Sequence, residues 1–173
     1  MDYVLGNVYI SEDEVKALIP LLEQLKTPQV VWRGLGIRED RIEDLYSEKY
    51  HWVYRPTSTT TDLGIALHFC HMGEMLSTEC VLLKILLPVN FPVVDVNFFK
   101  RKTRIDEKEL LLLPKINNNR LCFEIVDKQK ANDAEVISYL SMHPQRFNRW
   151  NGKQIINNFL LITVKAYYTQ TDE

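Results

Sequence analysis

The first helical pattern lies near the N-terminus, where apolar residues recur at helical spacing between positions 15 and 25. Ser11 and Glu14, just ahead of it, have the spacing of a capping box, which satisfies the first free N–H groups of a helix. Pro20 interrupts the pattern and would cost about 3 kcal/mol inside a straight helix, so we expect a kink or two shorter helical pieces. Pro28 ends the segment.

Segments rich in β-branched, aromatic and leucine residues follow, each bounded by proline, glycine or polar residues. The predicted strands are 29–34, 51–56, 81–88, 93–99, 109–114, 121–126 and 159–168. A polar turn over 58–61 leads into a helix from Leu63 to Cys70, a short helix is predicted over 135–140, and 35–50 is predicted as a charged loop. Because turns or short loops separate most strands, we predict an α+β fold with mainly antiparallel sheets.

Size and composition favour a single domain over residues 1–173, since 173 residues with 46% hydrophobic content match one ordinary core. A net charge of −2 does not point to nucleic acid or membrane partners. Cys70, Cys80 and Cys122 lack disulfide or zinc-site spacing, so no metal is expected and a reducing compartment is. Without a signal peptide or a long apolar run, the expectation is a soluble, cytoplasmic protein, in the producing cell or an infected host cell.

The stretch IDEKELLLLP places Glu107 and Glu109 at the head of a leucine strand. In an extended chain residues two apart face the same side, so both carboxylates would enter one cleft, roughly 7 Å apart. Such a pair can stabilise a positive charge that develops in the transition state, as in the breaking of a glycosidic bond. The alternative interpretation is the solvated end of a strand, charged to prevent aggregation.

Two other segments carry candidate binding residues. Arg33 stands at a predicted strand end, where its guanidinium can bind phosphate in a two-bond fork, and Gly34 permits close approach of a flat ligand. The hydroxyls of Ser58 to Thr61 can hold a carboxylate and a ribose. An ordinary surface arginine and a plain turn with a helix cap are the alternatives.

In chain order, an aromatic-Arg-Gly strand end, an S-T-S-like turn before a helix and an E-x-E motif at a leucine strand resemble the R-S-E class of ADP-ribosyltransferases. That family includes arginine-modifying bacterial toxins, bacteriophage relatives and vertebrate ecto-enzymes. The resemblance covers about three-quarters of the chain. It implies two mainly antiparallel β-sheets packed around an NAD cleft with flanking helices, and NAD as the co-substrate.

The resemblance also assigns roles to the NAD-binding residues. Arg33 would bind a phosphate of NAD, and the backbone at Gly34 would receive the nicotinamide amide. Ser58, with Thr59 and Thr60, would stand where the family has S-T-S and would brace the catalytic glutamate and the nicotinamide ribose. Thr60 replaces the third serine of the family and keeps its hydroxyl.

For the chemical step, the resemblance makes Glu109 the catalytic glutamate, which stabilises the oxocarbenium ion as nicotinamide leaves. Glu107 would orient and help deprotonate the acceptor, which an arginine needs because its pKa is above about 12. Phe69 is similar to the family's aromatic residue beside the nicotinamide, with a plain core position as its alternative. The loop ahead of Glu107 lacks the aromatic residue that the family often carries there, unless Phe98 or Phe99 folds back.

The one strongly basic cluster lies in that same loop and consists of Lys100, Arg101, Lys102 and Arg104. If it selects the target, the target protein is acidic near its accessible arginine; a solvated turn is the alternative. Nucleic acid is less favoured, because family members that modify bases usually resemble Q-x-E, and Glu107 occupies that first position.

The sequence therefore predicts a mono-ADP-ribosyltransferase that acts on protein arginine. The alternatives are an NAD glycohydrolase, a transferase for a carboxylate or nucleic-acid acceptor, and a binding module that has kept the fold and lost turnover. Asn-, Lys- and Ile-rich segments such as KINNNR hint at an AT-rich genome, as in a viral or bacterial effector.

Overall fold

The computed structural model describes most of the chain, in the ranges 12–38, 41, 43–44, 47–73, 78–96, 108–130, 133–142 and 159–170. The N-terminal helical segment is split in two, α1 (Glu12–Leu18) and the 3-10 helix η1 (Ile19–Leu21), with Pro20 at the start of the second piece. The predicted interruption at Pro20 is thus confirmed, whereas Ser11 of the expected capping box lies outside the described residues. No helix in these ranges is long and apolar enough to cross a membrane.

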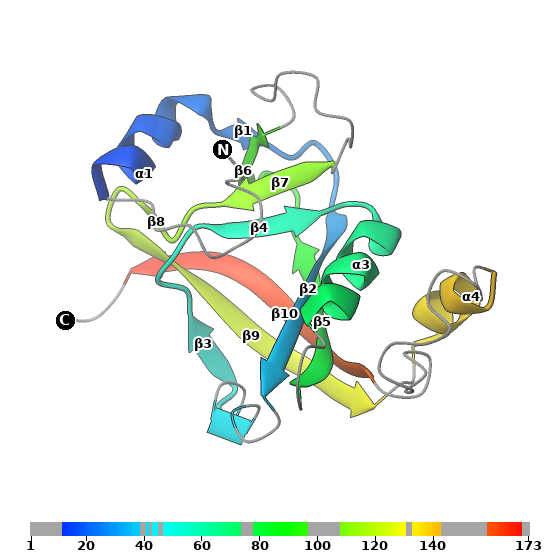
Figure 1. Cartoon of the computed structure of the whole chain (residues 1–173). Coiled ribbons are helices and arrows are strands. Elements are labelled where there is room, and N and C mark those ends of the chain that lie inside the picture. The colour runs from blue at the N-terminus through cyan, green and yellow to red at the C-terminus, as the bar shows by residue number, and fades with distance from the viewer. Residues whose placement is uncertain are drawn as a thin grey trace.

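The strands form one hydrogen-bonded path that divides into a short-stranded half and a long-stranded half (Figure 1). In spatial order the short half consists of β1 (Glu23–Gln24), β6 (Pro92–Asp95), β7 (Glu109–Leu112) and β4 (Thr57–Thr60). The long half consists of β2 (Gln29–Arg38), β5 (Thr78–Leu87), β10 (Phe159–Gln170), β9 (Asn119–Lys130) and β3 (Tyr50–Trp52), with β8 (Lys115–Ile116) also paired to β9. Pairing is antiparallel throughout these strands except between β5 and β10, so the predicted α+β fold with mainly antiparallel pairing is confirmed. The two expected sheets are joined into one continuous path.

The two halves pack face to face over the largest cluster of buried side chains. Leu110 and Leu112 of β7 meet Val31, Leu83 and Ile85 of the long half there. This contact follows from strand alternation, which turns every second residue of β7 to the same side. The leucine run of β7 therefore holds the two halves together.

A polar contact reinforces the packing between the halves. Tyr168 of β10 stacks on Phe91 with ring centroids 5.2 Å apart, and its hydroxyl donates a 2.6 Å hydrogen bond to the carbonyl oxygen of Leu113. The end of the long half is thereby tied to the chain just after β7.

Two helices cover the outer face of the long half. α3 (Leu63–Gly73) and α4 (Ala134–Met142) bury Leu67 and Val136, among others, against Trp32 of β2 and Leu82 of β5. In Figure 1, α3 lies directly along β2. On the other side of the molecule, α1 packs against β6 and β7.

Two local predictions were wrong. The segment predicted as a turn over 58–61 lies mostly in strand β4, because its β-branched threonines pair with β7. Strand β2 does not stop at Gly34 but continues to Arg38, because its partner β5 extends as far as Thr78.

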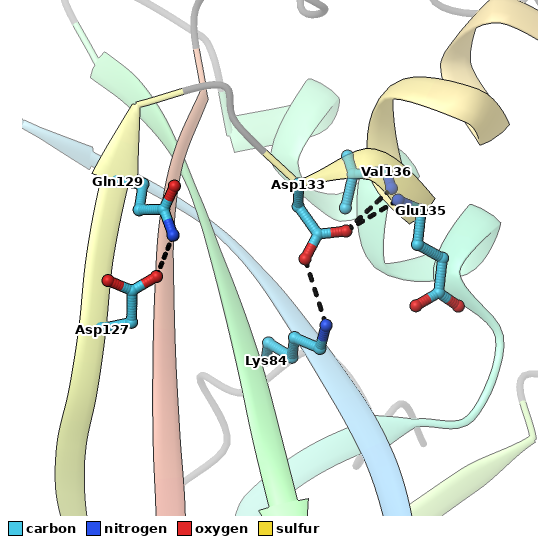
Figure 2. A network of polar contacts seen from close by, with 6 residues as sticks. All are labelled: Lys84, Asp127, Gln129, Asp133, Glu135 and Val136. Carbon is cyan, nitrogen blue, oxygen red and sulfur yellow. Dashed lines mark hydrogen bonds and ion pairs between the residues drawn. The ribbon is translucent and has the colours of Figure 1, made fainter.

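An ion pair fixes the start of α4 to the sheet (Figure 2). The Lys84 ammonium lies 3.1 Å from an oxygen of Asp133, and the other oxygen of Asp133 accepts hydrogen bonds from the N–H groups of Glu135 and Val136. Burial raises the pKa of Asp133. The hydrogen bonds from Lys84 and from the two N–H groups, together with the charge of Lys84, lower the pKa by a larger amount, so the net pKa is below the usual value. Lys84 also lies over the ring of Trp32, 5.3 Å from its centroid.

The substitution Asp133→Asn tests this anchor, because asparagine keeps an oxygen that caps α4 and removes only the charge. We expect the free energy of unfolding at pH 7 to fall by about 1.5 kcal/mol, the lower end of the range for a hydrogen bond to a charged group. Because the folded-state pKa is lowered, the contribution of Asp133 is complete above its unfolded pKa of about 4 and is lost as the pH falls through the folded value. Urea denaturation between pH 7 and pH 3 measures both effects.

Asp127→Asn is the matched control. Asp127 accepts a hydrogen bond from the side chain of Gln129 at an exposed site on β9, also drawn in Figure 2. Exposed polar pairs contribute little to stability, so this variant should unfold like the wild type. Equal losses in the two variants would contradict the anchoring role of Asp133.

Candidate functional site

A cleft opens where β2 and β4 part. These two strands share a single register pair, Trp32 with Thr60, within the part of the chain that the structure describes. The cleft contains about 410 Å³ of space, part of it open to solvent. Its lining residues come from four elements, β2, β4, α3 and β7, and are Trp32, Arg33, Gly34, Leu35, Ser58, Thr59, Thr60, Ile65, Ala66, Phe69 and Glu109.

A buried carboxylate forms part of the cleft wall. Glu109 is the first residue of β7 and is only 1% exposed. It is directly opposite Thr60 in the register, and Thr60 is opposite Trp32, so the three side chains lie on the same face of three neighbouring strands. A carboxylate in this position is shielded from water, which strengthens its interaction with any positive charge in the cleft.

Arg33 reaches across the junction from the opposite face of β2. Its Nη1 donates a 2.9 Å hydrogen bond to the carbonyl oxygen of Ser58, so the side chain bridges β2 and β4. On the neighbouring strand pair, the Thr59 hydroxyl donates a 2.6 Å hydrogen bond to the carbonyl oxygen of Leu110. These bonds fix both the guanidinium and the hydroxyl-rich strand relative to β7.

Helix α3 forms another wall and begins at an aspartate cap. Asp62 accepts hydrogen bonds from the N–H groups of Gly64 at 2.8 Å and Ile65 at 3.4 Å, so Asp62 takes the capping role among the polar residues ahead of the helix. Ile65 and Phe69 are four residues apart and therefore lie on the same face of α3. Both line the cleft.

Gly34 allows α3 to approach the sheet. A Cβ at this position would lie 1.8 Å from the carbonyl oxygen of Ala66 and 2.8 Å from the backbone nitrogen of Cys70. The close approach that this glycine permits is therefore that of a helix backbone. The predicted contact between Gly34 and a flat ligand stays a prediction.

The structure brings together most of the residues that the sequence indicated. Those that line the cleft are Arg33, Gly34, Ser58, Thr59, Thr60, Phe69 and Glu109. Glu107 and the basic cluster Lys100, Arg101, Lys102 and Arg104 lie outside the described residues. Within the described ranges no group of three His, Cys, Asp or Glu side chains could hold a metal ion.

The backbone of Lys108 changes the expected geometry of the E-x-E segment. The expectation that residues 107 and 109 share a face assumed an extended chain, but Lys108 between them has a φ of 44°. This left-handed conformation interrupts the strand alternation, and β7 begins only at Glu109. The two-residue rule therefore does not apply across Lys108.

Four of the lining residues, Trp32, Leu35, Ile65 and Ala66, received no role in the site from the sequence. Trp32 is the aromatic residue of the aromatic-Arg-Gly motif, and Leu35 follows that motif directly. Ile65 precedes Phe69 by about one helical turn, so the position of these residues in or beside a motif was the available signal. Their apolar side chains can pack against the rings of a ligand.

Comparisons of the sequence and of the structure with known proteins give different results. No protein-family model matches the chain. No curated protein matches it either. The search of solved structures, in contrast, finds clear matches to its fold.

Several of the matching structures are ADP-ribosyltransferases of bacterial origin. Plx2a, an ADP-ribosyltransferase toxin from Paenibacillus larvae, superposes with a TM-score of 0.52 at 14% identity over 90% of this chain and 70% of its own. C3larvin toxin from the same species gives 0.51 at 13% identity over 94% and 75%. The Vis toxin of Vibrio splendidus gives 0.51 at 14% identity over 90% of this chain, which spans only 55% of the Vis chain.

These matches show that the chain has the ADP-ribosyltransferase fold. At 13 to 14% identity they show the fold and not the reaction. The chemistry depends on the side chains in the cleft.

Gly34→Ala tests the packing that shapes the cleft. The added methyl group would overlap the Ala66 carbonyl, which belongs to a helix backbone and cannot rotate away, so α3 must shift. We expect the free energy of unfolding to fall by about 1 to 3 kcal/mol, the range for overpacked sites. Urea denaturation followed by circular dichroism provides the measurement.

Gly36→Ala, at an exposed position of the same strand, is the control. Alanine is favoured over glycine inside a strand by roughly 0.5 to 1 kcal/mol, so this variant should be as stable as the wild type or more stable. If Gly34→Ala were also neutral, the close contact with α3 would not limit the fold.

Proposed function

We propose that this chain is the catalytic domain of a mono-ADP-ribosyltransferase, which transfers ADP-ribose from NAD to an arginine side chain of a target protein and releases nicotinamide. The observation that carries the proposal is the placement of a buried carboxylate, Glu109, and a guanidinium, Arg33, in one cleft of an ADP-ribosyltransferase fold. In a reaction of NAD, the carboxylate can stabilise the ribose that becomes cationic, and the guanidinium can bind the negatively charged diphosphate.

The residues of the cleft fit the parts of NAD by their chemistry. The Arg33 guanidinium suits a phosphate, because it presents paired N–H donors in a planar fork. The hydroxyl-bearing strand Thr57–Thr60 suits a ribose, and the apolar residues Ile65 and Phe69 suit the nicotinamide ring.

In the proposed reaction the bond between the nicotinamide nitrogen and the ribose carbon breaks, and its electron pair leaves with nicotinamide. The ribose becomes an oxocarbenium ion, which the anionic carboxylate of Glu109 stabilises. The terminal nitrogen of the acceptor arginine then forms the new bond to this carbon and gives up a proton. Glu107 is assigned the role of accepting that proton.

The target would be a protein with an accessible arginine, and the basic residues between Lys100 and Arg104 favour an acidic surface around it. Water as the acceptor instead of arginine would make the chain an NAD glycohydrolase. Nicotinamide release and adduct formation, measured together, separate these outcomes.

Glu109→Gln should reduce nicotinamide release in the presence of NAD by about a hundredfold or more, the usual effect of removing one electrostatic contact with the transition state. Glu107→Gln should retain release with water as the acceptor but lose transfer to agmatine, a small arginine mimic. Chromatography quantifies nicotinamide, and intact mass spectrometry detects the adducts on agmatine and on lysate proteins.

Glu135→Gln, at an exposed position of α4, serves as the matched carboxylate control and should behave like the wild type. Release without adducts in the wild type would indicate a glycohydrolase or another acceptor. No release and no NAD binding by the wild type would contradict the proposal and favour a non-catalytic module.

Arg33→Lys should weaken NAD binding by about tenfold or more, because lysine keeps the charge but loses the planar fork and its strong hydrogen bonds. Calorimetry measures the Kd. Arg120→Lys is the control, since Arg120 lies over the ring of exposed Tyr54 and is not among the residues that line the cleft. An unchanged Kd for Arg33→Lys would remove Arg33 from the phosphate site.

A further inference from the structure

Lys108, the residue directly before Glu109, has an unusual backbone conformation. Its φ of 44° lies in the left-handed region, which residues other than glycine, asparagine and aspartate rarely adopt. Lysine has no side-chain group that favours this conformation locally, so contacts with the surrounding structure must maintain it.

Two contacts tie Lys108 to the segment between β4 and α3. Its carbonyl oxygen accepts a 3.2 Å hydrogen bond from the N–H of Thr61, and its ammonium lies 3.9 Å from Oδ2 of Asp62. Both partners belong to the short connection that follows β4.

Asp62 is itself fixed on both sides. Its Oδ1 accepts the 2.8 Å hydrogen bond from Gly64 that caps α3, and its N–H donates a 3.0 Å hydrogen bond to the hydroxyl of Thr60. Thr60 lies opposite Glu109 in the register. The end of β4, the start of α3 and the start of β7 therefore meet around Lys108.

We propose that Lys108 is a positioning residue: its left-handed backbone turns the chain into β7 so that Glu109 faces the cleft beside Thr60. The role rests on the function proposed above and adds a residue to it. The exposed lysine side chain assists by holding the turn against Asp62, but a partly exposed pair at this distance contributes little by itself. The backbone conformation is the main determinant.

A change in the backbone of Lys108 should affect turnover more than NAD binding. A shift in the entry to β7 moves the carboxylate of Glu109 relative to the reacting ribose carbon and leaves Arg33, on β2, in place. Misplacement of a catalytic group by about 1 Å can reduce turnover a hundredfold. The effect should therefore appear in kcat, with little change in the KM for NAD.

The test compares substitutions that differ in their tolerance of a positive φ. Lys108→Gly adopts it freely, Lys108→Ala tolerates it less, and the β-branched side chain of Lys108→Val opposes it most. For nicotinamide release we expect kcat of the valine variant to fall by about tenfold or more, with alanine intermediate and glycine within about threefold of the wild type. The KM for NAD should stay within about twofold in all three.

Thermal unfolding and calorimetric NAD binding are measured for each variant to establish whether it is folded. If the valine variant does not fold, the comparison of alanine with glycine decides the question. Equal kcat values for the glycine variant and the variants with a Cβ would overturn the positioning role. This holds whether all of them match the wild type or all of them fall to the same extent, since an equal fall would follow from the loss of the lysine charge. A wild-type protein that releases no nicotinamide would instead overturn the proposed function, and the positioning role with it.

Discussion

The site depends on one junction, the register pair between Trp32 and Thr60, at which the two halves of the sheet meet. Within the described residues β2 and β4 pair at this point and then follow separate directions. The junction fixes Trp32, Thr60 and, through the next strand, Glu109 in a row. Beyond it, residues from both faces of β2 reach the same space, so Arg33 and Gly34 line one cleft despite their opposite orientations.

The packing around the junction combines a tight contact with a costly one. Helix α3 approaches β2 so closely that only glycine fits at position 34. Glu109 lies nearby and is almost fully buried. Burying an ionised carboxylate costs free energy, whereas burying an apolar side chain at the same position would not. Proteins retain such groups where function uses them, and the leucines that follow Glu109 in β7 provide the compensating burial.

The sequence predicted the elements whose periodicity is local. Helices α3 and α4 and the strands rich in leucine and isoleucine are amphipathic or fully buried, so a short window reveals them. The segment 58–61 was misjudged because its hydroxyls suggested a turn, whereas its pairing partner, β7, lies about 50 residues further along the chain. Gly34 suggested a strand end because the sequence does not show that a helix backbone lies against it.

The candidate site was predictable as a set of residues but not as a shape. The order of the Arg-Gly, hydroxyl-rich and E-x-E segments indicated which residues belong together, and the fold brings the described ones to one cleft. The left-handed turn at Lys108 was invisible, since lysine carries no signal for it. A backbone angle maintained by tertiary contacts appears only in the structure.

The central place of β10 has a consequence for how the chain folds. Strand β10 is last in sequence among the described strands, yet it pairs with β5 on one side and β9 on the other, and its parallel ladder with β5 joins residues almost 80 positions apart. Such long-range pairing gives a high contact order and slow folding. The residues that line the cleft all precede β10 in the sequence. The central strand of the sheet that supports the cleft can therefore pair only after all of these residues have been synthesised.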